Sequence, residues 1–141
     1  MAAINSRRVL IGALAGGAVW TLWSFLIGYT MLMSRYEAAQ KAGHFLEQAR
    51  YPFFAGFWII TIFLMAYVMA WLYASARATL GAGPGTALKI GLLVGFVAAF
   101  PGALGASSWA PYSRMIPLGQ MLEMWVGAIL ATLVAGWLYR D

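Results

Sequence analysis

Few side chains in the sequence could take part in chemistry, and Glu123 is the most informative of them. It stands near the start of a long apolar stretch, where an acidic side chain stabilises a helix N-terminus. Arg114 or Arg50 could pair with this carboxylate at the membrane interface, and a proton or cation site is its alternative use. If the protein binds a ligand, Tyr67 is a further candidate beside Glu123.

The other reactive residue types do not form a recognisable site. His44 is the only histidine, and it lies in a charged segment near Glu37 and Glu47, a thinner ligand set than zinc sites use. The chain has no cysteine, which excludes disulfides and thiolate chemistry. Serines and threonines within the apolar stretches have no base nearby that could activate them as nucleophiles. We therefore expect no catalytic residue, no metal and no cofactor, and a protein that is not an enzyme.

Four apolar stretches must position these residues, and each is long enough to cross a membrane. The sequence of 141 residues is 63% hydrophobic and only 9% charged. At about 1.5 Å per residue, roughly 20 residues of helix cross a hydrocarbon core of about 30 Å. The apolar stretches cover residues 9–33, 53–75, 88–108 and 121–139. We predict an all-α membrane protein with four transmembrane helices in one domain, 1–141, and a short amphipathic surface helix within residues 34–52.

The basic residues predict an orientation in the membrane and give no reason to expect nucleic-acid binding. The net charge is +5, but the basic residues stand at the ends of the apolar stretches and form no stripe. With the N-terminus inside, five basic residues lie on the inner side and four on the outer side, and the inner segments are shorter. The inner set is Arg7, Arg8, Arg77, Lys89 and Arg140, and the outer set is Arg35, Lys41, Arg50 and Arg114. We predict that both termini are cytoplasmic.

Two pairs of glycines could bring helices into close contact. Gly12 and Gly16 lie four residues apart at the start of the first apolar stretch, and Gly91 and Gly95 have the same spacing in the third. In an apolar helix this spacing places both glycines on one face, where a neighbouring backbone can approach closely. We expect the glycine faces of the first and third helices to meet.

The two glycine pairs also indicate an internal repeat. A shift of 79 residues places the first pair on the second, and a shift of 66 places Trp71-Leu72-Tyr73 on Trp137-Leu138-Tyr139. We predict a tandem repeat of two helical hairpins, 1–80 and 81–141, with a pseudo-twofold axis along the membrane normal. The same shift places Trp20 on Ala99, so the large ring of one helix could fill the space beside the small residue of the other. Chance matches among abundant small residues are the alternative to a repeat, and a ligand-facing Trp20 is the alternative to a packed one.

Three short motifs carry a resemblance to known proteins. They are Arg8-Val9-Leu10-Ile11-Gly12 before the first span, Tyr51-Pro52-Phe53-Phe54 at the second, and Ala70-Trp71-Leu72-Tyr73 at its end. In these motifs and in its four spans the chain is similar to small four-span bacterial inner-membrane proteins of unknown function. The resemblance implies a four-helix membrane fold in the bacterial inner (cytoplasmic) membrane. It implies no activity and no functional residue.

Two functions agree with these observations. The first is a non-catalytic accessory or assembly subunit of a larger membrane complex, in contact with lipids and with other membrane subunits or copies of itself. It is favoured by the lack of reactive groups and by the many small-residue helix faces. The alternative is a small transporter or a lipid- or quinone-binding protein that uses the interface between the hairpins, with Glu123, Arg114, Trp20 and Tyr67 as candidate residues. A water-lined cavity between the two hairpins that reaches Glu123 would favour transport, and a dry, closely packed interface would count against it.

Overall fold

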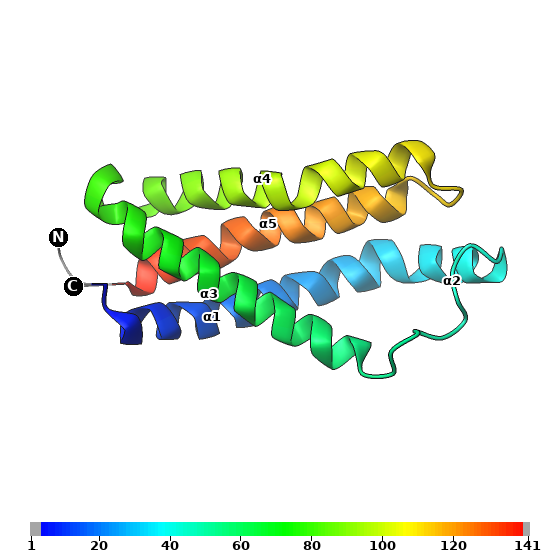
Figure 1. The fold of residues 1–141 in the computed structure, drawn as a ribbon, viewed down its shortest axis with the longest axis horizontal. Coiled ribbons are helices and arrows are strands. Elements are labelled where there is room, and N and C mark those ends of the chain that lie inside the picture. The colour runs from blue at the N-terminus through cyan, green and yellow to red at the C-terminus, as the bar shows by residue number, and fades with distance from the viewer. Residues whose placement is uncertain (1–3, 140–141) are drawn as a thin grey trace.

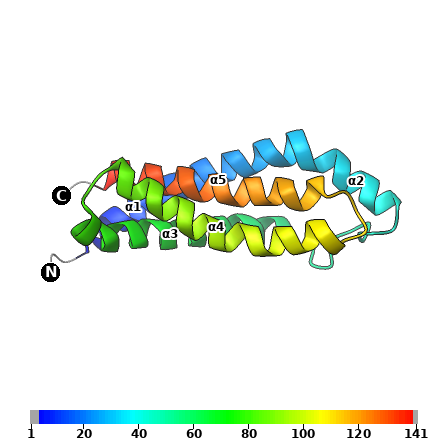
Figure 2. The same ribbon diagram turned by 90° about the horizontal axis from the view of Figure 1, so that it is seen from above.

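The protein is an all-helical bundle, seen here in a computed structural model that describes residues 4–139 (Figure 1). The elements are α1 (Ser6–Ile27), the π-helical segment η1 (Gly28–Leu32), α2 (Met33–Lys41), α3 (Phe54–Leu80), α4 (Pro84–Trp109) and α5 (Met115–Leu138). Four helical runs are long and apolar enough to cross a membrane, and α1, η1 and α2 together form the first of them. Helix α1 starts and α5 ends at the same end of the bundle, here called the termini end (Figures 1 and 2). Helix α2 lies at the opposite end.

Two boundaries differ from the sequence prediction. The segment after residue 33 does not form a separate surface helix, because α2 continues the first helical run as far as Lys41. The last helix starts at Met115, six residues before the predicted start at residue 121. Pro117 lies within its first turn, where a missing backbone N–H costs no helical hydrogen bond. Glu123 is therefore eight residues inside α5 and not at its beginning.

Helix α5 contacts each of the other three long helices, and its largest interfaces are with α1 and α4. In the described chain α1 and α4 do not contact each other. Figure 1 shows α5 running between α4 above it and α1 below it. The prediction that the glycine faces of the first and third helices meet is therefore wrong.

Both glycine pairs pack against α5. A Cβ atom added at Gly16 would lie 2.8 Å from the carbonyl oxygen of Ala131, and one added at Gly12 would lie 3.1 Å from the Cα atom of Ala135. On the α4 side, a Cβ added at Gly91 would lie 2.7 Å from the Cα atom of Ile129. The close backbone approach expected from the spacing thus occurs, but with α5 as the shared partner.

Trp20 does not face Ala99 either. Its indole lies on Gly127 of α5, where any added Cβ would collide with the ring, and only 2% of the Trp20 side chain is exposed. The small residue that accommodates this ring is therefore Gly127. A twofold relation between the hairpins would also make the α3–α4 interface resemble the α1–α5 interface, whereas α3 and α4 contact each other much less. The tandem repeat stays a prediction from sequence.

The termini end of the bundle is held by polar contacts of two tyrosines. The Tyr139 hydroxyl accepts a hydrogen bond from the backbone N–H of Asn5 at 2.9 Å, and the Arg77 guanidinium lies 4.8 Å from the centre of the Tyr139 ring. The Tyr73 hydroxyl accepts a hydrogen bond from the backbone N–H of Gly83 at 3.0 Å, which fixes the α3–α4 turn. Gly81 opens this turn with φ of 87°, a conformation that favours glycine. The termini end is closely packed as a result.

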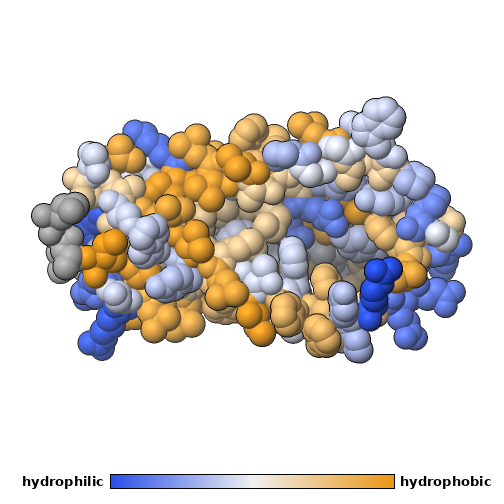
Figure 3. All heavy atoms as spheres, in the orientation of Figure 1, coloured by the Kyte–Doolittle hydropathy of each residue, from blue (hydrophilic) through white to orange (hydrophobic). Residues whose placement is uncertain are grey.

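The outer surface of the bundle is apolar along its length. Leu14, Leu22, Leu64 and Val97 are all more than half exposed, which is the pattern of side chains that face lipid. Figure 3 shows apolar side chains over the middle of the molecule and hydrophilic ones gathered at its ends. These observations agree with a multi-pass membrane protein.

Candidate functional site

A cavity opens between all four helical runs in the half of the bundle toward α2. Its volume is about 840 Å³. The same half of the molecule is visibly hollowed in Figure 3. The lining side chains are mainly apolar, and the polar ones are Ser24, Tyr29, Tyr36, Trp58, Gln120 and Glu123.

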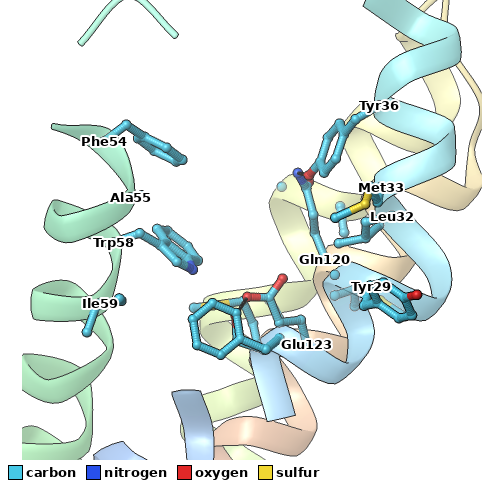
Figure 4. A pocket seen from close by; sticks show the side chains of 18 of the residues that line it. Tyr29, Leu32, Met33, Tyr36, Phe54, Ala55, Trp58, Ile59, Gln120 and Glu123 are labelled. Atoms are coloured by element: carbon cyan, nitrogen blue, oxygen red, sulfur yellow. Dashed lines mark hydrogen bonds between the residues drawn. The ribbon is translucent and has the colours of Figure 1, made fainter. Parts of the chain in front are cut away.

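Among residues 4–139, Glu123 is the one carboxylate that lines this cavity. Only 7% of its surface is exposed, and it lies about 12 Å along α5 from Met115 at 1.5 Å per residue. The Ser24 hydroxyl on α1 donates a hydrogen bond to its Oε1 atom. The indole nitrogen of Trp58 on α3 also points toward the carboxylate (Figure 4). Glu123 thus accepts a hydrogen bond from α1 and faces the indole nitrogen of an α3 residue.

The register between α1 and α5 fixes the Ser24–Glu123 pair. Residues 12, 16 and 20 of α1 face residues 135, 131 and 127 of α5, four residues apart on both antiparallel helices. The next step of the same register joins Ser24 to Glu123. The small residues that bring the helices together at the termini end therefore also decide where the carboxylate lies.

The π-helical segment η1 forms one wall of the cavity. The backbone N–H of Met33 bonds to the carbonyl of Gly28, one residue further back than in an α-helix. π-Helical turns of this kind are rare and occur frequently at functional sites. A Cβ added at Gly28 would meet nothing within 4 Å, because this glycine borders the open space. The altered helix geometry is thus located beside the cavity.

Aromatic side chains from opposite walls define the mouth of the cavity (Figure 4). On α3, the rings of Phe54 and Trp58 stack with centroids 6.2 Å apart and an interplanar angle of 24°. On the other side, the Tyr36 hydroxyl of α2 accepts a hydrogen bond of 2.6 Å from the Gln120 side-chain amide of α5. Phe54 is 55% exposed, so this ring lies at the outer edge.

Trp20 closes the cavity toward the termini end. It lies one helical turn below Ser24 and is buried against Gly127. Its Nε1 atom has no hydrogen-bond partner among the described residues. Beyond it, buried residues such as Ala131 and Thr132 fill the interior. The cavity therefore has a closed floor and does not continue through the bundle.

The residues predicted from sequence are only partly brought together. Glu123 lines the cavity, but Arg114 and Arg50 are exposed and neither contributes to the charge environment of Glu123. The expected ion pair at the membrane interface is therefore wrong, because α5 starts earlier and carries Glu123 into the bundle. Tyr67 is 43% exposed on α3 and does not line the cavity. Ala99, which the sequence predicted opposite Trp20, lines the cavity, and its small side chain leaves space there.

Sequence reasoning missed Trp58, Phe54, Tyr36 and Gln120 as parts of a site. One signal was available for its centre. Positions 123, 127, 131 and 135 recur every four residues, so Glu123 belongs to the same stripe as the small residues that face α1. This spacing predicts an inward-facing carboxylate.

The cavity holds no set of side chains typical of a metal centre. Within residues 4–139 no three His, Cys, Asp or Glu side chains gather closely enough to hold a metal ion. His44 is exposed in the segment after α2 and lies outside the cavity. The chemistry that this site offers is recognition by one carboxylate, a few polar groups and apolar surface.

Comparisons with known proteins give no family for this fold or site. No protein-family model, curated protein or solved structure matches the chain.

Proposed function

We propose that the protein binds a small amphipathic molecule, such as a lipid or a quinone, taken up from the membrane. The observation that carries this proposal is the cavity around the buried carboxylate of Glu123. An ionisable residue at membrane depth is costly, and its usual reason is a functional site. A polar head group near Glu123 and an apolar body along the walls would satisfy both kinds of lining surface.

The size and lining of the cavity support a small-molecule ligand. Binding sites of this kind have volumes of about 300–1,000 Å³ and combine apolar walls with a few polar groups. The volume of about 840 Å³ lies within this range. A closely packed subunit interface would not need such a space.

The path of entry is consistent with a ligand dissolved in lipid. Helices α3 and α4 contact each other little, and both contribute lining residues. Phe54 of α3 and Gly102 of α4 border the cavity and are exposed at the surface of the bundle. An apolar molecule could enter between these helices without crossing water.

The closed floor favours binding over transport. Transport requires a site that opens alternately to both sides of the membrane. Here Trp20 and Gly127 separate the cavity from the termini end. A transporter would need a second conformation in which this contact separates, so we propose a binding role.

A glycine of α4 gives a direct test. Gly102 lines the cavity, and a Cβ added there would meet nothing within 4 Å, so the side chain of Gly102→Leu has an open start from which to extend into the cavity. Gly105→Leu is the matched control, because Gly105 is equally open on the same helix but does not line the cavity. Binding of alkyl probes, measured by native mass spectrometry in dodecyl maltoside, should be lost in Gly102→Leu and retained in Gly105→Leu. Equal binding by both variants would refute the proposal.

The remaining expectations from sequence stay predictions. They are the tandem repeat of hairpins 1–80 and 81–141, the bacterial inner membrane with cytoplasmic termini, and a role as accessory subunit. Arg140, one of the residues used for the orientation, lies outside the described residues. The same native mass spectra bear on the subunit role, because a stable second polypeptide in the complex would support it.

A further inference from the structure

Among the described residues, the lining of the cavity includes an acidic side chain but no basic one. Glu123 is an acidic side chain, and no lysine, arginine or histidine is among the residues that line the cavity. Nor does any basic residue of the described chain contribute to the charge environment of Glu123. A buried carboxylate without a counter-charge is costly in an apolar medium. Either a proton taken up by the carboxyl group or a cation beside it relieves this cost, and only the cation would make the cavity selective for charge.

The hydrogen-bond donors that lie next to Glu123 already face its carboxylate. Ser24 donates to Glu123, and the indole of Trp58 points toward the same carboxylate. The Gln120 amide donates to the Tyr36 hydroxyl at 2.6 Å. The Tyr36 hydroxyl accepts that bond and keeps its own O–H to donate, so one donor remains on the opposite wall. Next to Glu123 the remaining hydrogen-bonding capacity is that of the carboxylate oxygens, which are acceptors.

Aromatic rings flank the space in front of Glu123. Phe54 and Trp58 come from α3, and Tyr36 comes from the opposite wall (Figure 4). Aromatic faces attract ammonium groups, and cages of such rings recognise quaternary ammonium ligands. The carboxylate and the rings therefore favour the same kind of ligand.

From these observations we infer that the cavity selects a ligand with a positively charged head group, an ammonium or an alkylated ammonium, on an apolar body. Glu123 is its counter-charge, and the aromatic walls surround the cationic carbons. This inference rests on the proposed binding function and names its ligand class. The ammonium could belong to a zwitterionic lipid such as phosphatidylethanolamine, whose phosphate would have to lie away from Glu123, or to a free lipophilic cation. Anionic lipids and fatty acids are disfavoured by repulsion from the same carboxylate.

Three probes with the same chain and different charges test the inference. They are hexadecyltrimethylammonium, hexadecanol and hexadecanoate, each titrated into the full chain in the uncharged detergent dodecyl maltoside. We expect the cation to bind most tightly and the anion most weakly. Glu123→Gln, which keeps the shape and the acceptor for Ser24, should weaken cation binding by about tenfold to a hundredfold, the usual effect of losing a charged partner. The same variant should leave hexadecanol binding unchanged.

Controls separate charge from folding. Glu37→Gln removes an exposed acid of α2 that does not line the cavity, so it should leave the preference for the cation intact. Should Glu123→Gln fail to fold, the probe series on the unmodified chain tests the charge preference by itself, and Glu123→Asp should retain it. Displacement of the bound cation by phosphatidylethanolamine would identify a lipid source, and displacement by tetraphenylphosphonium alone would identify a free cation.

The outcomes distinguish this inference from the proposed function. Equal affinity for all three probes, with binding still lost in Gly102→Leu, would overturn the inference and leave the proposed function standing. Binding that is unaffected by both Gly102→Leu and Glu123→Gln would overturn both.

Discussion

Replacing a helical glycine by alanine should have opposite effects at two kinds of position in this protein. Gly16 and Gly91 lie where a Cβ atom would be 2.8 Å from the carbonyl oxygen of Ala131 and 2.7 Å from the Cα atom of Ile129. Both neighbours are backbone atoms of α5, which cannot turn aside as a flexible side chain can. Gly105 of α4 has no atom within 4 Å of an added Cβ and serves as the control.

The magnitudes follow from two opposing effects. Alanine in place of glycine stabilises a helix interior by about 0.5–1 kcal/mol, because glycine loses more backbone freedom on folding. Overpacking a tightly packed contact costs about 1–3 kcal/mol. At Gly105 only the first effect acts, so Gly105→Ala should be stabilising or neutral. At Gly16 and Gly91 the second effect should prevail and leave a net destabilisation of up to about 2.5 kcal/mol.

Thermal unfolding in detergent, followed by circular dichroism, measures the difference. We expect Gly16→Ala and Gly91→Ala to lower the Tm by a few degrees relative to the unmodified chain and Gly105→Ala to leave it unchanged or higher. The result that would refute the reasoning is an increase in Tm at Gly16 or Gly91 equal to that at Gly105. It would mean that α5 is not in close backbone contact with α1 and α4.

Two further substitutions test contacts at the two ends of the bundle. Tyr73→Phe removes the hydroxyl that accepts the Gly83 N–H, so it should lower stability by about 0.5–1.5 kcal/mol in the same unfolding assay; an unchanged Tm would show that the α3–α4 turn does not depend on this bond. Arg114→Gln should change neither the Tm nor the affinity for the cationic probe, because Arg114 is exposed and does not pair with Glu123. A loss of cation selectivity in Arg114→Gln would mean that Arg114 does pair with Glu123, as the sequence suggested.

The existence of the four helices was predictable from sequence because the membrane limits what a long apolar stretch can do. Such a stretch has to satisfy its backbone polar groups internally, and a helix does so. The boundaries were less predictable. Pro117 and Gln120 look like loop residues, yet the first turn of a helix tolerates proline and Gln120 pairs with Tyr36. Charged residues after position 33 look like a surface segment, yet they continue the first helix.

The partners of the glycine faces were not predictable from one sequence. Two small residues on one helix face indicate that some backbone comes close, but they do not say which helix supplies it. Gly12 and Gly91 were expected to face one another and instead contact the two sides of α5. The predicted repeat led to this expectation, because it treated the first and third helices as equivalent. In the structure these helices lie on different sides of α5. The deciding information was on α5 itself, where Gly127, Ala128 and Ala131 are all buried.

The cavity was not predictable because it depends on a contact that is largely missing. Helix α3 packs against α1 and α5, but it contacts α4 little. No pattern in the sequence predicts that two neighbouring helices will leave a space between them. The stripe from Glu123 to Ala135 predicts an inward-facing carboxylate, but not the space in front of it.

The packed and hollow halves of the bundle depend on each other. Along the α1–α5 register, small residues hold the helices together up to Gly127, and the next position is the Ser24–Glu123 pair. A carboxylate placed any lower would be enclosed among buried residues such as Ala131 and Thr132, with no room for a counter-ion. At the floor of the cavity, the carboxylate can accept a hydrogen bond from Ser24, lie beside the indole of Trp58 and still face a ligand. The close packing at the termini end thus determines the position along α5 at which a carboxylate can reach a ligand. The cavity lowers the cost of burying this carboxylate, because it leaves space for a partner.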